Sequence, residues 1–307
     1  MNIGVVGAGG IGSYYAGTLS RAGHQVRLVA RGPHLAAMRE RGLEVRTAGS
    51  DESFTVRPEV SDDGALVAKC EFVVVAVKSY SLSEVGPSLV GAAKSGATIV
   101  PLLNGADVTE RLVALGVPEP AILGGIIHAS LVRTEPGIVY RKGPSDRVTI
   151  GEFGQPSSER AKKIVDAFAG GGSNARLSAD ISGDIWRKFA FIVPMGIACG
   201  LSRQPMGPVL ASESGRRILT DSLREVVMVA RAAAGRLDDG DEIRVRDELF
   251  GIGPAIKPSF LLDLERGGPT ELDLLAGTVR RLGREHGVPT PVANLATAAF
   301  EVALGGS

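Results

Sequence analysis

The chain has 307 residues, a length that suits two domains of ordinary size. Its 34 Lys and Arg residues balance 34 Asp and Glu residues, so the global charge gives no reason to expect nucleic acid or an anionic membrane surface as a partner. Hydrophobic residues make up 44% of the sequence, which excludes a chain that is mainly disordered.

Residues 1 to about 178 alternate short β-branched runs with helical stretches. The runs are strongly apolar, as in strands buried on both faces of a sheet, and they comprise Asn2–Val6, Gln25–Val29, Phe72–Val77, Ala97–Leu103 and Ala121–Ile127. Helical stretches such as Ile11–Arg21 and Leu82–Ala93 lie between them. This alternation predicts an α/β domain of the Rossmann type with a doubly wound parallel sheet.

Two further pairs of runs in this half are expected to be antiparallel. Leu43–Thr47 is predicted to pair with Phe54–Arg57. Ile138–Arg141 is predicted to pair with Arg147–Ile150 across the turn residues Gly143-Pro144-Ser145-Asp146. The glycine-rich segment 170–173 is interpreted as a linker or loop near the domain boundary.

After about residue 180 the strand-like runs stop and helical patterns follow. The predicted helices are Ile181–Ala198, Glu213–Gly235, Asp241–Phe250, Thr270–His286 and Val292–Leu304. Pro194 lies inside the first of them and is expected to kink it. The sequence therefore predicts a Rossmann-type domain over residues 1–178 and an all-α domain over residues 179–307.

A glycine motif marks the end of the first predicted strand. The segment Gly7-Ala8-Gly9-Gly10-Ile11-Gly12 has the spacing G-x-G-x-x-G and opens the first predicted helix. In this context Gly7 permits a tight turn, Gly9 lets the backbone approach a pyrophosphate, and Gly12 lets helix and strand pack closely. Because a helix start offers amides and a partial positive charge to phosphate, we expect a dinucleotide site, with a turn that binds no ligand as the alternative.

The end of the second predicted strand bears on the choice of nucleotide. NAD sites place Asp or Glu there, but this chain has no carboxylate before Glu40 and has Arg31 at that position. A guanidinium binds a 2′-phosphate through charge-assisted hydrogen bonds. We therefore expect NADP(H) rather than NAD(H); the alternative is that Arg31 is a solvated surface residue.

Two polar positions follow later strands of the predicted sheet. Lys78 follows the run Phe72–Val77, and Asn104-Gly105 follows Ala97–Leu103. Ligands of open α/β sheets bind outside the carboxyl ends of the strands. A cation and an amide there are suited to ribose, nicotinamide or a substrate carboxylate, whereas the alternatives are a solvated lysine and an ordinary Asn-Gly turn.

The second half completes a pattern of motifs. The first half contributes the glycine turn, Lys78 and Asn104-Gly105. The second half contributes Trp186-Arg187-Lys188, the run from Ser259 to Asp273, Gly277 and the segment from Gly287 to Pro291. In this order and spacing the chain resembles the ketopantoate reductases (2-dehydropantoate 2-reductases) over nearly its whole length. The resemblance implies NADPH-dependent reduction of the 2-oxo acid ketopantoate to (R)-pantoate for pantothenate synthesis.

The resemblance also implies roles for individual residues. It makes Lys188 the catalytic lysine, Ser259 a substrate-binding serine and Glu271 a glutamate near cofactor and substrate. It makes Asn104 a contact of both ligands and Ser130 a loop residue that contacts NADP. The chemistry of the reaction independently supports a lysine in this role. When hydride reaches the ketone carbon, negative charge develops on the ketone oxygen, and a positioned ammonium such as that of Lys188 stabilises it. The plain alternatives are a solvated lysine and a glutamate that compensates a helix dipole.

The chain departs from the family at two positions. Better-known members carry asparagines one and two turns after the lysine, where this chain has Ile192 and Gly196. Helical spacing puts both positions on the face of Lys188. Because a pocket without the polar partner discriminates less for a substrate hydroxyl, the substrate is either ketopantoate held in another way or a more apolar 2-oxo acid.

Other expectations concern partners and location. We expect a small 2-oxo acid as partner, no nucleic acid, no membrane and no metal, and the long amphipathic helices are compatible with a homodimer. The two cysteines, Cys70 and Cys199, lie in apolar runs and favour a reducing cytoplasm over a disulfide framework. The alternatives to a ketopantoate reductase are a related dehydrogenase that acts on another 2-oxo or 3-hydroxy acid and a nucleotide-sensing protein without turnover.

Overall fold

The apolar, β-branched runs of the first half form a parallel sheet. Its strand order is β5-β2-β1-β6-β7, and all neighbours are parallel. The strands are β1 (Asn2–Val6), β2 (Gln25–Val29), β5 (Glu59–Ser61), β6 (Phe72–Val75) and β7 (Thr98–Pro101). Every residue of β6 and β7 is buried, as expected for strands covered on both faces. This computed structural model describes residues 1–304, apart from the side chains of Pro144 and Ser145.

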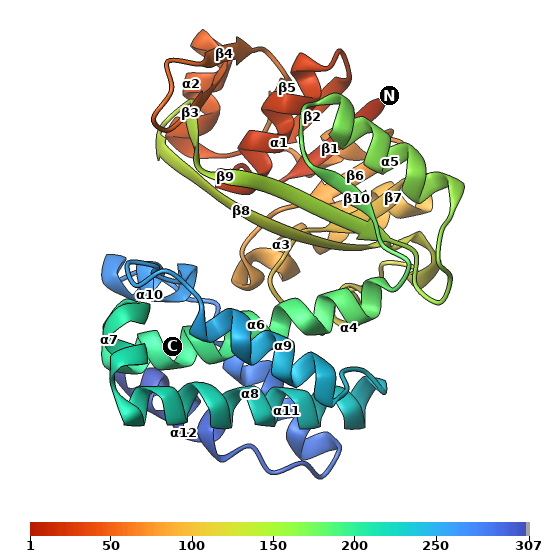
Figure 1. Cartoon of the computed structure of the whole chain (residues 1–307). Helices are drawn as coiled ribbons and strands as arrows, with labels where there is room; N and C mark the ends of the chain where they lie inside the picture. The colour runs from red at the N-terminus through yellow and green to blue at the C-terminus, as the bar shows by residue number, and fades with distance from the viewer. Residues whose placement is uncertain (305–307) are drawn as a thin grey trace. The chain divides into compact units, whose positions relative to one another are not determined.

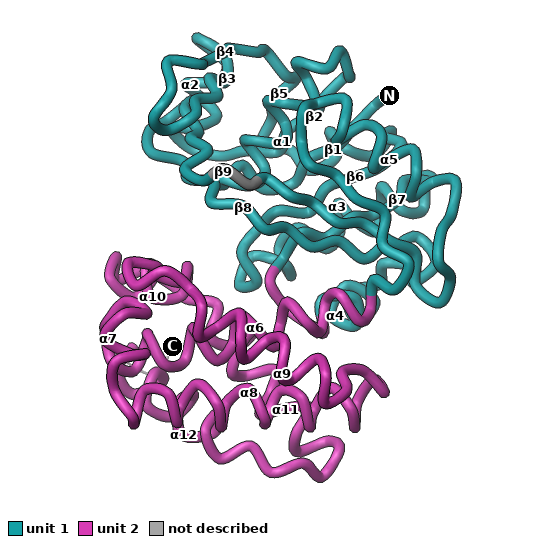
Figure 2. The backbone as a smooth tube through the Cα atoms, in the orientation of Figure 1, with its two compact units in different colours: residues 1–103, 108–181 teal, residues 104–107, 182–307 magenta. Residues whose placement is uncertain are grey.

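The chain divides into two compact units. The first comprises residues 1–103 and 108–181, and the second comprises residues 104–107 and the chain from residue 182 onward (Figure 2). The short segment 104–107 thus follows a strand of the first unit but belongs to the second. Each unit has a hydrophobic core of its own.

Five α-helices belong to the first unit (Figure 1). They are α1 (Gly10–Arg21), α2 (Gly32–Arg41), α3 (Leu82–Lys94), α4 (Val108–Ala114) and α5 (Glu159–Gly170). Helix α1 contacts strands β1 and β2 of the parallel sheet and also strands of a second sheet. The apolar residues of α1, such as Tyr15 and Leu19, are therefore fully buried.

The second sheet contains a long antiparallel hairpin. Its strands are β3 (Leu43–Thr47), β4 (Ser53–Val56), β8 (Gly124–Glu135), β9 (Ile138–Gly151) and β10 (Ala175–Leu177). Strand β9 pairs antiparallel with β8 and parallel with β3 and β10. The antiparallel pairing of β3 with β4 confirms the first of the two predicted pairs.

The second predicted pair is wrong. Ile138–Arg141 and Arg147–Ile150 lie on the single strand β9, and each pairs with β8 instead. Asp146 is not a turn residue, because its buried carboxylate accepts a hydrogen bond from the Tyr14 hydroxyl at 2.7 Å. A long partner strand has here overridden local turn propensity. The other supposed turn residues include Pro144 and Ser145, whose side chains lie outside the described part of the structure.

Two further expectations in this half need correction. Ala121–Ile127 is not a strand of the parallel sheet, since only Ile122 bridges to Ile99 of β7 and the chain then enters β8. The glycine-rich segment 170–173 connects α5 to β10 inside the first unit, so it is a loop and not a linker between units. Neither error changes the fold class, because the parallel sheet and its helices are present as predicted.

The second unit is helical. Its helices are α6 (Ile181–Ser202), α7 (Met206–Ala211), α8 (Glu213–Ala234), α9 (Asp239–Phe250), α10 (Ser259–Arg266), α11 (Thr278–Glu285) and α12 (Pro291–Ala303). Helix α6 continues past Pro194 to Ser202. The predicted helix Thr270–His286 is shorter than expected, because a π-helical turn, η4 (Asp273–Gly277), precedes α11.

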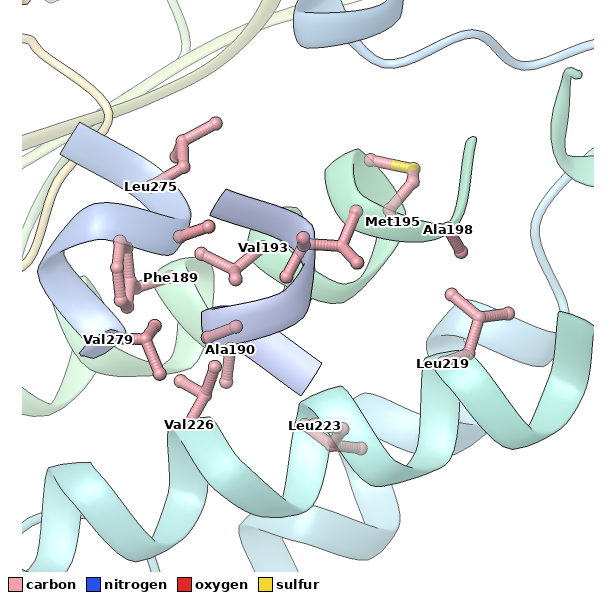
Figure 3. Close-up of a cluster of buried hydrophobic side chains, with 14 of the residues drawn as sticks. Phe189, Ala190, Val193, Met195, Ala198, Leu219, Leu223, Val226, Leu275 and Val279 are labelled. Atoms are coloured by element: carbon pink, nitrogen blue, oxygen red, sulfur yellow. The ribbon is translucent and has the colours of Figure 1, made fainter. Parts of the chain in front are cut away.

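Helix α6 lies in the core of this unit. Its side chains Phe189, Ala190 and Val193 pack with Leu223 and Val226 of α8 (Figure 3). The helix is long and apolar enough to cross a membrane by length and composition, but 67% of its most apolar window is buried inside the protein. Such burial is typical of the central helix of a helical domain.

Candidate functional site

The glycine turn between β1 and α1 has the geometry that a dinucleotide site needs. Gly7 has φ +103°, and a Cβ on it would lie 2.7 Å from the backbone carbon of Ala76. A Cβ on Gly12 would lie 1.8 Å from the carbonyl oxygen of Gly7. Both positions therefore require glycine for reasons of backbone conformation and close packing.

Gly9 differs from its neighbours, because a Cβ on it would meet no atom of the protein within 4 Å. Gly10 is constrained by the hairpin, since its Cβ would lie 2.1 Å from the carbonyl oxygen of Leu131. Protein packing thus explains Gly7, Gly10 and Gly12 but not Gly9. Open space in front of Gly9 fits a pyrophosphate that approaches the backbone there.

The start of α1 is suited to an anion. Gly9 is the N-cap residue, and no side chain caps the helix. The half-buried residues Ala8 and Ile11 flank this start. Amides at a helix N-terminus attract phosphate through hydrogen bonds and the helix dipole, so the turn fits the diphosphate of a dinucleotide.

Arg31 stands at the end of β2, as predicted, and is the N-cap residue of α2. Its guanidinium is exposed and forms an ion pair with Glu84, in the first turn of α3. Sequence reasoning missed Glu84, because the contact joins residues 53 positions apart. The carboxylate neutralises part of the charge that Arg31 would offer to a 2′-phosphate.

Lys78 and Ser130 complete the predicted cofactor residues of the first unit. Lys78 is half-buried and precedes the short 3₁₀ turn Ser79–Ser81. Ser130 is exposed and lies within β8, where the register with β9 shifts, so it is a strand residue rather than the loop residue that we expected. An irregular pairing of this kind commonly redirects a side chain at a functional site.

In the second unit, Lys188 and Asn104 are in direct contact. The Nζ atom of Lys188 donates a hydrogen bond to Oδ1 of Asn104 at 2.8 Å. Lys188 is only 9% exposed, so it is not the solvated lysine of the plain alternative. The hydrogen bond unites two predicted site residues that lie 84 positions apart.

Burial and charge act on Lys188 in opposite directions. Burial disfavours the ammonium and lowers the pKa of Lys188 to about 8, while the charge of Glu271 raises it. Glu271 is itself buried and lies two residues before the π-helical turn η4. The arrangement gives an amine that is charged at neutral pH but titrates near the physiological range, as acid catalysts do.

A buried carboxylate that sequence reasoning missed fixes the segment 104–107. Asp107 is 2% exposed and accepts a hydrogen bond from Nη2 of Arg281 at 2.7 Å and from Oγ1 of Thr278 at 3.2 Å. Both partners belong to α11. These bonds tie the segment that carries Asn104 to the helical unit, which holds the amide beside Lys188.

The remaining predicted positions lie on two helices. Ser259 is exposed and is the first residue of α10. On α6, Ile192 is half-buried and Gly196 is buried, and neither side chain can donate a hydrogen bond. Within the described part of the chain, no group of three or more His, Cys, Asp or Glu residues could hold a metal ion, and both cysteines are free and buried.

A nucleotide-type turn in an α/β unit, followed by a helical unit with a buried lysine, defines the class of dinucleotide-dependent oxidoreductases. The sequence profile of ketopantoate reductase PanE/ApbA matches residues 3–155, and the profile of its C-terminal domain matches residues 180–303. The chain therefore belongs to the ketopantoate reductase family.

Among curated relatives, two are 30% identical to this chain. One is named uncharacterized oxidoreductase YkpB, from Bacillus subtilis (strain 168), and the match covers 94% of both chains. The other is 2-dehydropantoate 2-reductase of Halobacterium salinarum, and the match covers 95% of both chains.

Solved structures agree on the fold. The PanE/ApbA family ketopantoate reductase of Ralstonia eutropha JMP134 superposes with a TM-score of 0.88 at 26% identity, over 98% of both chains. D-mandelate dehydrogenase in complex with NADH has a TM-score of 0.86 at 23% identity, over 99% of this chain and all of that one. Together with the family profiles, these similarities confirm the predicted α/β fold with a helical C-terminal region.

Proposed function

We propose that the protein reduces a 2-oxo acid to a 2-hydroxy acid with NADPH, and that ketopantoate, reduced to (R)-pantoate, is the first substrate to test. The observation that carries this proposal is the buried ammonium of Lys188, 2.8 Å from Asn104 Oδ1 and within the field of Glu271. A buried cation is costly unless it has a task or a partner. Here its partners hold it in place and leave further N–H donors for a substrate oxygen.

The reduction divides the work between cofactor and protein. The nicotinamide, when bound, supplies the hydride for the ketone carbon. Lys188 hydrogen-bonds the ketone oxygen, stabilises the negative charge that develops on it and donates the proton that completes the hydroxyl group. Lys188 is then neutral and regains a proton before the next turnover.

Asn104 and Glu271 control that lysine. The amide oxygen of Asn104 accepts one N–H of Lys188 and so orients the ammonium. The negative charge of Glu271 favours the protonated form, against the burial that disfavours it. Ser259, at the start of α10, offers its hydroxyl and the helix amides to the substrate carboxylate.

For the cofactor, we propose that the turn from Gly7 to Gly12 binds the diphosphate and that Arg31 binds the 2′-phosphate of NADP. Lys78, Ser130 and Asn104 would contact the nucleoside portions. The open space before Gly9 and the uncapped start of α1 support the diphosphate assignment. The guanidinium of Arg31 at the end of β2 supports the phosphorylated cofactor, and its ion pair with Glu84 is the contact that a 2′-phosphate would replace.

A second candidate is the reduction of a different, more apolar 2-oxo acid. Ile192 and Gly196 favour it, because neither can hydrogen-bond the 4-hydroxyl of ketopantoate. A third, a nucleotide sensor without turnover, has less support, because it gives the buried Lys188 no task. A homodimer and a cytoplasmic location remain expectations from the sequence.

The test is NADPH oxidation, followed by absorbance, with ketopantoate and a panel of other 2-oxo acids. We expect turnover with at least one of these acids. NADPH binding without oxidation in the presence of any acid would leave only the sensor.

A further inference from the structure

A polar pocket lies on the second unit, between α11 and the start of α12, and it shares no residue with the candidate reductase site. Its volume is about 430 Å³, which falls in the range of pockets that bind small molecules. The residues that line this α11–α12 pocket are Arg280, Arg284, Val288, Pro289, Thr290 and Asn294. None of these lining residues carries a carboxylate, so the pocket is positively charged.

Two guanidinium groups give the pocket its charge. Arg280 and Arg284 are four residues apart on α11, so they lie on the same face of the helix. Among the residues that the structure describes, Arg284 forms no ion pair, and the pair of Arg280 with Glu301 has an N–O distance of 3.6 Å, longer than a hydrogen bond. Like charges at this spacing repel each other, and an anion bound between them would remove that repulsion.

Thr290 adds a buried hydroxyl group that the protein itself does not use. It is the N-cap residue of α12 and only 4% exposed, yet its side chain does not cap the helix. The Glu225 carboxylate accepts the amide hydrogen bonds of Val292 and Ala293 instead, at 2.6 and 2.9 Å. Within the described part of the chain, the Thr290 hydroxyl has no hydrogen-bond partner, so it is available to a ligand in the pocket that it lines.

The position of Thr290 depends on a glycine of α11. A Cβ on Gly283 would lie 2.6 Å from Cγ2 of Thr290 and 3.2 Å from its Oγ1. Glycine at this position therefore lets the threonine pack directly against the helix that carries both arginines. The hydroxyl and the guanidinium groups thus line one pocket, although they come from different segments.

This set of donors suits phosphate better than carboxylate. Each guanidinium presents several N–H groups in a fixed fork, and the Thr290 hydroxyl and the exposed Asn294 amide add further donors. A phosphate group has more acceptor oxygens and more charge than a carboxylate, so it can satisfy more of these donors. Val288 and Pro289 provide an apolar wall for the organic part of a ligand.

We propose that the α11–α12 pocket is a second ligand site, which binds a phosphorylated small molecule through its phosphate group. Arg280 and Arg284 hold the phosphate oxygens by charge-assisted hydrogen bonds, and Thr290 donates a further bond. The site is separate from the glycine turn and from Lys188, so the inference does not depend on the proposed reduction.

The test is isothermal titration calorimetry of the wild-type protein with pyrophosphate, at constant ionic strength, and with citrate as a carboxylate of similar charge. We expect pyrophosphate to bind at least about tenfold more tightly than citrate. A protein that does not bind pyrophosphate would overturn the inference. Citrate binding of equal strength would overturn the assignment to phosphate.

Variants show whether this pocket is the place of binding. Arg284→Gln should weaken pyrophosphate binding at least about tenfold. Thr290→Val, which keeps the shape of the side chain but removes the hydroxyl, should weaken it about three- to tenfold. The matched control is Arg217→Gln, which removes an exposed arginine of α8 in the same unit and should stay within about twofold of the wild type.

A further control separates this pocket from the glycine turn of the first unit. Gly9→Ala places a methyl group where the diphosphate of the dinucleotide is proposed to bind, and it should leave pyrophosphate binding by the α11–α12 pocket unchanged. The melting temperature of each variant reports that it is folded. Wild-type affinity in Arg284→Gln, or a loss of binding confined to Gly9→Ala, would overturn the inference.

Discussion

Lys188 shows how a single side chain acquires its chemistry from its surroundings. An exposed lysine has a pKa near 10.4 and is a weak acid at neutral pH. Burial in the second unit lowers the pKa of Lys188 to about 8, and Asn104 and Glu271 hold the charged form in place. The residue is thus protonated at neutral pH yet close enough to its titration to release a proton readily.

The pH dependence of the reduction follows from this pKa. Because the protonated lysine is required, kcat/KM should be level below about pH 8 and fall about tenfold per pH unit above it. Glu271→Gln removes the charge that raises the pKa of Lys188, so the decline should begin at lower pH. The measurement is the pH profile of kcat/KM, with Glu265→Gln, which removes an exposed carboxylate on α10, as the control. A decline that starts at the same pH in Glu271→Gln would contradict this role.

The ion pair between Arg31 and Glu84 bears on cofactor choice. A 2′-phosphate must compete with the Glu84 carboxylate for the guanidinium. We expect Glu84→Gln to tighten NADPH binding a few-fold and leave NADH binding unchanged, since both groups are exposed and screened by solvent. Arg31→Ala should remove the preference for NADPH that we propose.

Fluorescence titration of each variant with NADPH and NADH measures these effects. Glu59→Gln, which removes the exposed partner of Arg27 on the same sheet, is the control and should alter neither affinity. An unchanged ratio of the two affinities in Arg31→Ala would show that the residue does not select the phosphorylated cofactor.

At the scale of elements, the glycines of the turn between β1 and α1 have different roles: one is required for packing and another leaves room for a ligand. Gly12 has no room for a side chain, whereas Gly9 has open space in front of it. We expect Gly12→Ala to lower the melting temperature by several degrees, because a Cβ at 1.8 Å from the Gly7 oxygen forces the helix off the strand. Gly9→Ala should lower the melting temperature less, by about 2 to 4 °C, because alanine is a poorer N-cap than glycine but its Cβ meets no atom of the protein.

The same pair of variants tests the diphosphate assignment. NADPH binding by Gly9→Ala should weaken at least about tenfold, since the added methyl group occupies the approach to the backbone amides. Differential scanning calorimetry and cofactor titration of both variants provide the two readouts. A Gly9→Ala protein that binds NADPH like the wild type would place the diphosphate elsewhere.

The helices and strands also show which parts of the fold sequence patterns are sufficient to predict. Strands β1 and β2 and helices α1 and α3 lie where hydrophobic periodicity and the glycine motif predict them, because their signals are local. Strand β9 was misread, since its glycine and proline suggest a turn while its partner β8 lies in the preceding segment. The ion pair of Glu84 with Arg31 and the hydrogen bonds of the buried carboxylates of Asp107 and Asp146 depend on long-range contacts, so they leave no local signal in the sequence.

For the molecule as a whole, the chain brings residues together within each unit from distant positions. Asn104 follows strand β7 of the first unit but belongs to the second, where Asp107 anchors its segment to α11. Motif order singled out Lys188, Asn104 and Glu271 as candidate site residues, yet it predicted neither the hydrogen bond between Lys188 and Asn104 nor the burial of Lys188 and Glu271. A small apolar cavity lined by Val193, Gly196 and Phe260 likewise forms only because α6, α10, α12 and the π-helical turn pack together.

The central claim is that Lys188 donates the proton to the reduced substrate, and the most direct test is single-turnover oxidation of NADPH by Lys188→Ala in the presence of the best 2-oxo acid. We expect the rate of the chemical step to fall by about a thousandfold, while NADPH binding stays within a few-fold of the wild type. A Lys188→Ala protein that oxidises NADPH at the wild-type rate would contradict the account.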